Sequence, residues 1–430
     1  QGNYPQAQQQ LEHAYAMLEA LDERSIECGE ATAHQKQRGL ADTLRALGTV
    51  YWYQGQYPEA RTCYETAMRY YRELHYTRGE AHCLNNLGVL VSDSHPEEAL
   101  AFHQQALVKY REIGNRSGEA RALSNIAFLL VTRGDLDTAR TAYLQTLELR
   151  RAAKDWAGET VVLSNLGEIA LMQGRYEEAR AFFEQSRQIN HEIGNRQGEG
   201  GNLGNLGATA FWRGDYATAR QLLEQALASS NELGLRRAEC DNLLVLCQLF
   251  HETGDLASAR ARGEEALRLT REVGYRYTEA AVLSELGYIS YEERNLEAAR
   301  AAFQEALDIQ RQIGQYHLTL DSRAALALLA LEQERSPEAL TAVRQEVEDI
   351  WEVLKSQQLA AVAQAPRIYL TCHRLLEALG DERAETPLEQ AYQLLQDRAA
   401  GLPDTADRQL FLQAGCTNRA IVAAWRAKHL

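Results

Sequence analysis

The amino-acid sequence predicts an all-α protein, built as a right-handed α-solenoid of stacked antiparallel helix pairs. First, nearly the same segment recurs about every 40 residues. Second, apolar residues within each copy are spaced i, i+3, i+4 and i+7, which is the period of an amphipathic helix. Third, the chain is rich in the helix formers Ala, Leu, Glu, Gln and Arg and holds only seven Pro. These observations favour helices over strands.

Three consecutive copies show the repeat. They read LSNIAFLLVTRGDLDTARTAYLQT at 123–146, LSNLGEIALMQGRYEEARAFFEQS at 163–186 and LGNLGATAFWRGDYATARQLLEQA at 203–226. In each copy an apolar stretch (helix A) precedes a Gly-containing turn and a second apolar stretch (helix B), which predicts an antiparallel helix pair. One pair cannot bury its apolar face alone, so neighbouring pairs must stack.

Small residues recur at fixed places in the repeat. The middle of helix A carries Gly48, Gly88, Ala127, Gly167, Gly207, Cys247, Gly287 and Ala327. An Ala follows twelve residues later in every copy but one, where Ala99 follows after eleven, and a third small residue usually follows after seven more. Small side chains let two helix backbones approach closely. A Gly after helix B predicts a left-handed cap, and a Glu in the first turn of helix A suits the helix dipole.

The spacing of twelve and seven, carried by Gly167, Ala179 and Ser186, resembles the tetratricopeptide repeat. The 40-residue length and the words NLG, GDY and IGNR are similar to the long-repeat subclass found in kinesin light chain and spindle-orientation adaptors. This resemblance implies a superhelix whose inner groove, lined by helix A, binds a protein or peptide segment. The tail from Gly401 also resembles the C-terminal tail of bacterial NTPases of the STAND type, and of related cyclases and transcription regulators. That second resemblance implies the sensor region of a larger signalling protein.

Four segments are expected along the chain. Residues 1–40 read as a partial leading repeat with an insertion, in a longer helix B or a loop. Residues 41–345 hold eight repeats, and residues 346–400 an insertion plus a ninth repeat marked by Cys372, Ala384 and Ala391. Residues 401–430 are expected to form capping helices over an apolar end face. Because the chain starts with Gln1, we expect it to be part of a longer protein.

Charge and composition limit the classes of partner that the chain is expected to bind. The formal net charge of −15 disfavours nucleic acid as a partner. No apolar run approaches the ~20 residues of a membrane helix, so no membrane partner is expected. The seven cysteines show no CxxC spacing, which disfavours a disulfide framework or a zinc ribbon. A reducing, cytoplasmic location is the simplest interpretation.

No catalytic, cofactor or metal motif is found. The adjacent pair Cys372 and His373 cannot supply the three or four ligands that zinc needs. The stretch GEGGNLGNLG at 198–207 resembles a nucleotide-binding loop, but it falls inside a predicted helix A without the preceding strand that such a loop requires. We therefore expect a protein that is not an enzyme and that needs no cofactor.

A stripe of polar residues marks the predicted groove. Four consecutive copies carry Asn at the same position of helix A, two residues before the small residue: Asn86, Asn125, Asn165 and Asn205. An amide can donate and accept at once, as a peptide backbone does, so this Asn ladder could clamp a peptide. It could equally bond the adjacent helix and brace the stack. The other predicted groove residues are Asn85, Arg45, Arg121, Ser164, Tyr53 and Trp212, with Arg121 as the candidate for gripping a carboxylate.

The sequence therefore predicts a protein- or peptide-binding scaffold or sensor, and further domains of the same parent chain are candidate partners. Two alternatives stay open. One is a structural module that stacks end to end with other copies, and the other is a sensor of a small molecule or a peptide signal.

Overall fold

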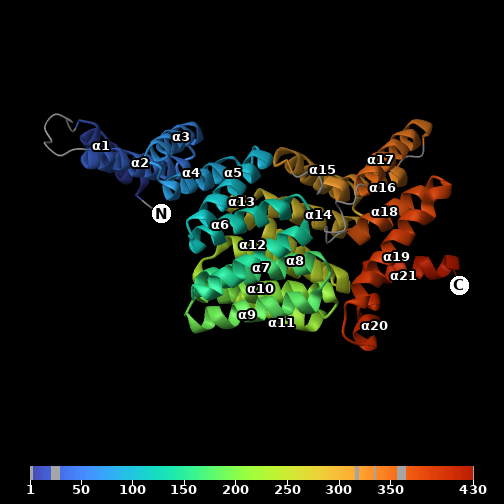
Figure 1. The fold of residues 1–430 in the computed structure, drawn as a ribbon. Helices are drawn as coiled ribbons and strands as arrows, with labels where there is room; N and C mark the ends of the chain where they lie inside the picture. The colour runs from blue at the N-terminus through green and yellow to red at the C-terminus, as the bar shows by residue number, and fades with distance from the viewer. Residues whose placement is uncertain (1–2, 21–29, 315–318, 334–335, 356–364, 430) are drawn as a thin grey trace. The chain divides into compact units, whose positions relative to one another are not determined.

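The computed structural model describes residues 3–20, 30–314, 319–333, 336–355 and 365–429. All regular structure in these ranges is helical, which confirms the predicted all-α class. The chain divides into two compact units, residues 1–162 (unit 1) and 163–430 (unit 2). Within each unit, consecutive helices pack side by side as antiparallel neighbours (Figure 1).

Unit 1 holds helices of 15 to 24 residues. They are α1 (Tyr4–Ala20), α2 (Glu30–Tyr53), α3 (Tyr57–Glu73), α4 (Thr77–Val91), α5 (Pro96–Glu112), α6 (Arg116–Thr132) and α7 (Leu136–Ala152), followed by α8 (Trp156–Met172), which crosses into unit 2. Helix A of each repeat is an even-numbered helix here, and helix B is the odd-numbered helix that follows it.

Unit 2 continues the same alternation and then departs from it near the end of the chain. Its helices are α9 (Tyr176–Glu192), α10 (Arg196–Arg213), α11 (Tyr216–Leu233), α12 (Arg236–Thr253), α13 (Leu256–Val273), α14 (Arg276–Glu292), α15 (Leu296–Gln312), α16 (Thr319–Gln333), α17 (Pro337–Lys355), α18 (Ala365–Ala378), the 3-10 turn η3 (Glu382–Ala384), α19 (Glu385–Ala400), α20 (Thr405–Gln413) and α21 (Cys416–His429).

Glycine and aspartate set the turns between helices A and B. Gly214 ends α10 with φ of +89°, in the left-handed region that residues with a Cβ rarely adopt. The next residue, Asp215, caps α11 by accepting a hydrogen bond from the Thr218 backbone N–H over 3.2 Å. The Gly-Asp pair of the recurring GDY motif thus ends one helix and begins the next.

The small positions are buried, as their spacing predicts. The Ala that follows the turn is 0% exposed in seven repeats, as Ala60, Ala99, Ala139, Ala179, Ala219, Ala259 and Ala299. The stretch GEGGNLGNLG at 198–207 lies inside α10, which is a helix A, and not in a loop.

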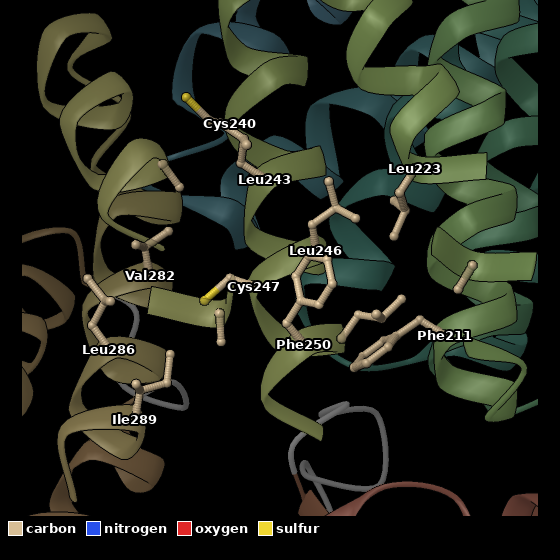
Figure 2. Packing of buried hydrophobic residues seen from close by; sticks show 14 of the residues in the cluster. Phe211, Leu223, Cys240, Leu243, Leu246, Cys247, Phe250, Val282, Leu286 and Ile289 are labelled. Atoms are coloured by element: carbon tan, nitrogen blue, oxygen red, sulfur yellow. The ribbon is translucent and has the colours of Figure 1, made fainter. Parts of the chain in front are cut away.

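Each unit has its own apolar core. In unit 2 the largest cluster joins five helices, α10 to α14. Figure 2 shows Phe211 of α10 and Leu223 of α11 beside Leu246 and Phe250 of α12, with Leu286 of α14 on the other side. The core runs along the stack because every helix A packs between the pairs that precede and follow it.

The two predicted insertions fall partly outside the described residues, at 21–29 and 356–364. Helix B of the leading half-repeat, α1, has the ordinary length of 17 residues. The helix with extra length is α2, a helix A of 24 residues. At the other end, where a ninth repeat is expected, α18 packs against α19, and Cys372 and Ala391 are fully buried.

The C-terminal helices contact more than the end of the stack. Helix α21 packs on α18 and α19, and it also reaches α12. The Glu252 carboxylate of α12 accepts hydrogen bonds from the backbone N–H groups of Cys416 and Thr417 at the start of α21. Arg213 of α10 pairs with Asp407 of α20 over 2.5 Å. The predicted cap is therefore also a C-terminal arm that folds back onto the helix A ends of α10 and α12.

Candidate functional site

Two of the ladder asparagines, Asn165 and Asn205, lie at equivalent positions of α8 and α10 in unit 2. Both are half-buried. Neither side-chain amide forms a hydrogen bond with another described residue. Asn86 of α4, in unit 1, is in the same state. These amides are therefore free to bond a ligand.

Asn125 and Asn85 bond to each other instead. The Asn125 Nδ2 donates to Asn85 Oδ1 over 3.1 Å, which links α6 to α4. Asn85 is buried, and its Oδ1 also lies 3.2 Å from His103 Nδ1. At this step of the repeat the two amides brace adjacent helices, whereas Asn86, Asn165 and Asn205 form no such brace with described residues.

The two predicted arginines are engaged with tyrosines of helix B. Arg121 donates to the Tyr110 hydroxyl over 2.7 Å and lies 2.8 Å from His82 Nδ1. Burial and the charge of Arg121 lower the pKa of His82 to about 4, so this imidazole is neutral. Arg45 of α2 bonds to the Tyr71 hydroxyl of α3, the other helix of its own repeat. Arg121 is exposed, but its guanidinium already serves as a brace within unit 1.

Ser164 also serves the stack. Its Oγ lies 3.1 Å from Ser186 Oγ of α9 and donates to Asn202 Oδ1 of α10 over 3.0 Å. Asn202 in turn donates to Ser186 over 2.8 Å. This closed set of bonds ties three helices together and leaves Ser164 little capacity for a ligand.

The predicted aromatic residues differ in exposure. Tyr53 is 56% exposed and stacks on Tyr4 with ring centroids 5.0 Å apart. Trp212 is partly buried and meets the Phe211 ring edge-on at 4.9 Å. Asn205 and Trp212 are seven residues apart on α10, so they share one face of that helix.

A cavity lies where the C-terminal arm meets this face of unit 2. Its volume is about 70 Å³. Aromatic side chains form much of its wall, and four charged side chains reach it. The wall includes Tyr176, Phe211, Trp212, Tyr216, Phe411, Gln248, Glu252, Glu285, Arg367 and Arg398. The wall residues come from helices that lie far apart in the sequence of unit 2.

A buried ion network closes one side of the cavity. Arg367 of α18 pairs with Glu285 of α14 over 3.1 Å and with Asp321 of α16 over 2.8 Å. His251 of α12 reaches the second oxygen of Glu285 over 2.5 Å. Burial by itself raises the pKa of Glu285, but Arg367 and His251 together hold it at about 2. This network joins α12, α14, α16 and α18.

The cavity was missed from the sequence because its residues lie far apart in the chain. The repeat pattern singled out Trp212, but it contains no signal for Arg367 or Arg398, which lie beyond the eight repeats. Within the described residues, no group of three or more His, Cys, Asp or Glu side chains is placed to hold a metal ion. No helix in the described ranges has the length and apolar character needed to span a lipid bilayer.

Comparison with known proteins gives the family. The tetratricopeptide repeat family model matches residues 39–112, 118–190, 201–272 and 278–348. No curated protein sequence matches the chain. Among solved structures, apo RapI is similar at 13% identity and a TM-score of 0.56, covering 64% of this chain and 99% of its own.

Two further solved structures are similar in fold. The apo form of the quorum sensor NprR from B. thuringiensis shares 18% identity at a TM-score of 0.54, with 65% of this chain and 79% of that chain covered. The STAND protein PH0952 from Pyrococcus horikoshii, which has a tetratricopeptide repeat sensor, shares 15% identity at a TM-score of 0.51, with 85% of this chain and 53% of that chain covered. With helix pairs of this spacing and a family match over most of its length, the chain belongs to the tetratricopeptide repeat family.

Proposed function

We propose that this protein binds a peptide or an extended protein segment along the helix A face, and that binding rather than catalysis is its activity. The observation that carries the proposal is the pair of free amides on Asn165 and Asn205. They stand at the same position of consecutive helices A, are half-buried, and form no hydrogen bond with any residue that the structure describes. A side-chain amide whose donor and acceptor groups are both unused can bond the alternating N–H and C=O groups of an extended peptide.

The physical argument is one of pre-organisation. A helix holds its side-chain amide in place, so little entropy is lost when a peptide bonds to it. Ser164 of α8, Ser186 of α9 and Asn202 of α10 form a set of hydrogen bonds that ties these helices together without using Asn165 or Asn205. The two roles, bracing and binding, are thus assigned to different side chains of unit 2.

The similar structures support a sensor role. NprR is described as a quorum sensor and PH0952 as a STAND protein whose repeats are its sensor. By analogy we propose that this chain is the sensor part of a larger bacterial signalling protein, working in the cytoplasm. Peptide binding would then change the state of another domain of the same parent chain.

The test removes the two free amides. Linear peptides are selected from a phage-displayed 12-residue library on the wild-type protein, and the dissociation constant of the best peptide is measured by calorimetry. We expect Asn165→Ala/Asn205→Ala to weaken binding about tenfold, because each lost hydrogen bond is worth about 0.5–1.5 kcal/mol. Since neither amide has a partner, the melting temperature should stay unchanged.

The matched control is Gln225→Ala, which removes an exposed amide from a helix B. It should bind the peptide as the wild type does. Equal affinity of the double variant and the wild type would contradict the proposal. A clearly lower melting temperature of the double variant would instead show that these amides stabilise the stacked helices.

A further inference from the structure

We propose that the cavity between the C-terminal arm and the repeats of unit 2 is a binding site for a small apolar carboxylate, whose anionic group pairs with Arg398. The site is separate from the proposed peptide face, because Asn165 and Asn205 are not part of its wall. Its ligand class follows from three features of the wall: an unbalanced buried charge, the hydrogen bonds already made by the other charged groups, and an aromatic lining.

The first feature is the Arg398 guanidinium. Arg398 is only 8% exposed and lies in the last turn of α19. It donates a hydrogen bond to the Tyr176 hydroxyl, and no carboxylate oxygen of a described residue lies within 4.0 Å of it. A buried charge without a counter-charge is costly, and the negative end of the helix dipole offsets only part of that cost. The site therefore favours an anion.

The second feature is that the hydrogen-bonding capacity of the other charged groups of the wall is already used. Glu285 is held between Arg367 and His251. The Glu252 carboxylate accepts hydrogen bonds from the Cys416 and Thr417 backbone N–H groups, at the positive end of the α21 dipole. Among the charged side chains of the described wall, Arg398 is the one whose hydrogen-bond partner is a single neutral hydroxyl, and a carboxylate would match it by two parallel hydrogen bonds.

The third feature is the apolar lining. Phe211, Trp212 and Phe411 contribute aromatic surface to the same wall. The Gln248 side chain also reaches the cavity, is only 9% exposed, and has no hydrogen-bond partner among the described residues. The cavity volume of about 70 Å³ exceeds the space of a single water molecule and is below that of drug-sized ligand sites. It fits a compact apolar group that carries one charged end.

The experiment compares an acid with its neutral amide on the full chain. Propionate and propionamide, which are small enough for a cavity of this volume, are titrated by calorimetry at one ionic strength. We expect propionate to bind at least about tenfold more tightly, as the loss of charge-assisted hydrogen bonds predicts. Arg398→Met should abolish this preference. Arg426→Met, at an exposed arginine of the C-terminal arm, should keep it.

Melting temperatures separate a ligand-binding arginine from a structural one. Because Arg398 has no counter-charge among the described residues, Arg398→Met should melt at the wild-type temperature or above it, and propionate should raise the melting temperature of the wild type only. A lower melting temperature for Arg398→Met would make the residue structural and overturn the proposal. Arg398→Lys, which keeps the charge but not the forked geometry, should bind propionate with intermediate affinity.

A second pair of probes distinguishes the source of the carboxylate. The tripeptide Gly-Gly-Ala is tested as the free acid and as the C-terminal amide. Binding of propionate points to a free small acid, and binding of the tripeptide acid alone points to a peptide C-terminus; either supports the proposal. Equal binding of acid and amide in both pairs, or no binding of either acid at millimolar concentration, overturns it.

Discussion

At the residue scale, the two helices of a repeat pair a small side chain with a large one. A Cβ added to Gly167 would lie 2.6 Å from the Phe183 ring, and one added to Gly287 would lie 2.7 Å from the Phe303 ring. Where helix A carries the larger Cys247, the opposite position of helix B is a glycine, Gly263. In each case a small residue on one helix faces a larger residue on the other, so the two together fill the contact without overlapping.

Two glycines of α10 provide a matched test of this contact. A Cβ at Gly207 would lie 2.7 Å from Leu223 Cγ, whereas a Cβ at Gly201 would meet nothing within 4 Å. We expect Gly207→Ala to lower the free energy of unfolding by about 1–3 kcal/mol because of overpacking. Gly201→Ala should raise it by up to ~1 kcal/mol because Ala is the better helix former. Urea denaturation measures both, and changes of the same sign would contradict the assignment.

At the element scale, a buried set of charges ties α18 to the repeats that precede it. Arg367 of α18 bonds Glu285 and Asp321, and its guanidinium lies 4.1 Å from the centroid of the Tyr288 ring. Burial of these charges is costly unless each has a partner. Because Arg367 and its two acidic partners come from three helices, the network fixes how these helices meet.

This network makes stability depend on pH. Burial lowers the pKa of His251, but the bond and charge of Glu285 outweigh that effect and raise it to about 10, from an ordinary value of 6.5. A folded state that binds a proton more tightly is stabilised below the unfolded pKa and loses this stabilisation as pH rises towards 10. The free energy of unfolding should therefore fall between pH 7 and 10, by roughly 2 kcal/mol from this group.

The variant His251→Gln isolates this contribution. Its free energy of unfolding, measured in urea at pH 7, 8.5 and 10, should decline less than that of the wild type. His191→Gln, at an exposed histidine, serves as the control and should follow the wild type. An equal decline in His251→Gln and the wild type would show that this proton is not bound more tightly in the folded state.

At the scale of the whole molecule, each unit carries separate apolar clusters. The clusters of the first unit contain residues such as Tyr71, Tyr110 and Leu129, all before residue 163. In unit 2 the C-terminal arm adds Phe411 and Ile421 to a cluster that also holds Tyr176. The arm is thus part of the folded body of unit 2.

Deletion of residues 401–430 tests the importance of the arm. It removes the buried Leu402, Phe411 and Ile421, and each large apolar side chain contributes about 1.5–3 kcal/mol when fully buried. We expect amide hydrogen exchange to become faster in α10, α12 and α19, with a local loss of stability on the order of 3 kcal/mol. Unit 1 should keep its protection and serves as the internal reference. Unchanged exchange in α10 and α19 would contradict a structural role for the arm.

The candidate site was only partly predictable. The periodicity located Asn165 and Asn205, because a ladder at a 40-residue step can be read directly. It could not separate them from Asn125, whose amide bonds Asn85 in the structure. That difference depends on the side chain that each amide meets on the neighbouring helix. In the same way, the sequence predicted Arg121 as a groove residue because its spacing does not show that Tyr110 lies within hydrogen-bond distance.

By itself, the sequence determined the helix pairs, their register, the buried small positions and the caps at Gly214 and Asp215. These features depend on residues within a few turns of one another, so spacing encodes them. Only the tertiary structure decided which amides are free, how the C-terminal arm returns to α10 and α12, and that Arg398 is buried beside Tyr176 with no counter-charge in the described part of the chain. Those outcomes require residues distant in the chain to meet, and local helical periodicity carries no information about such meetings.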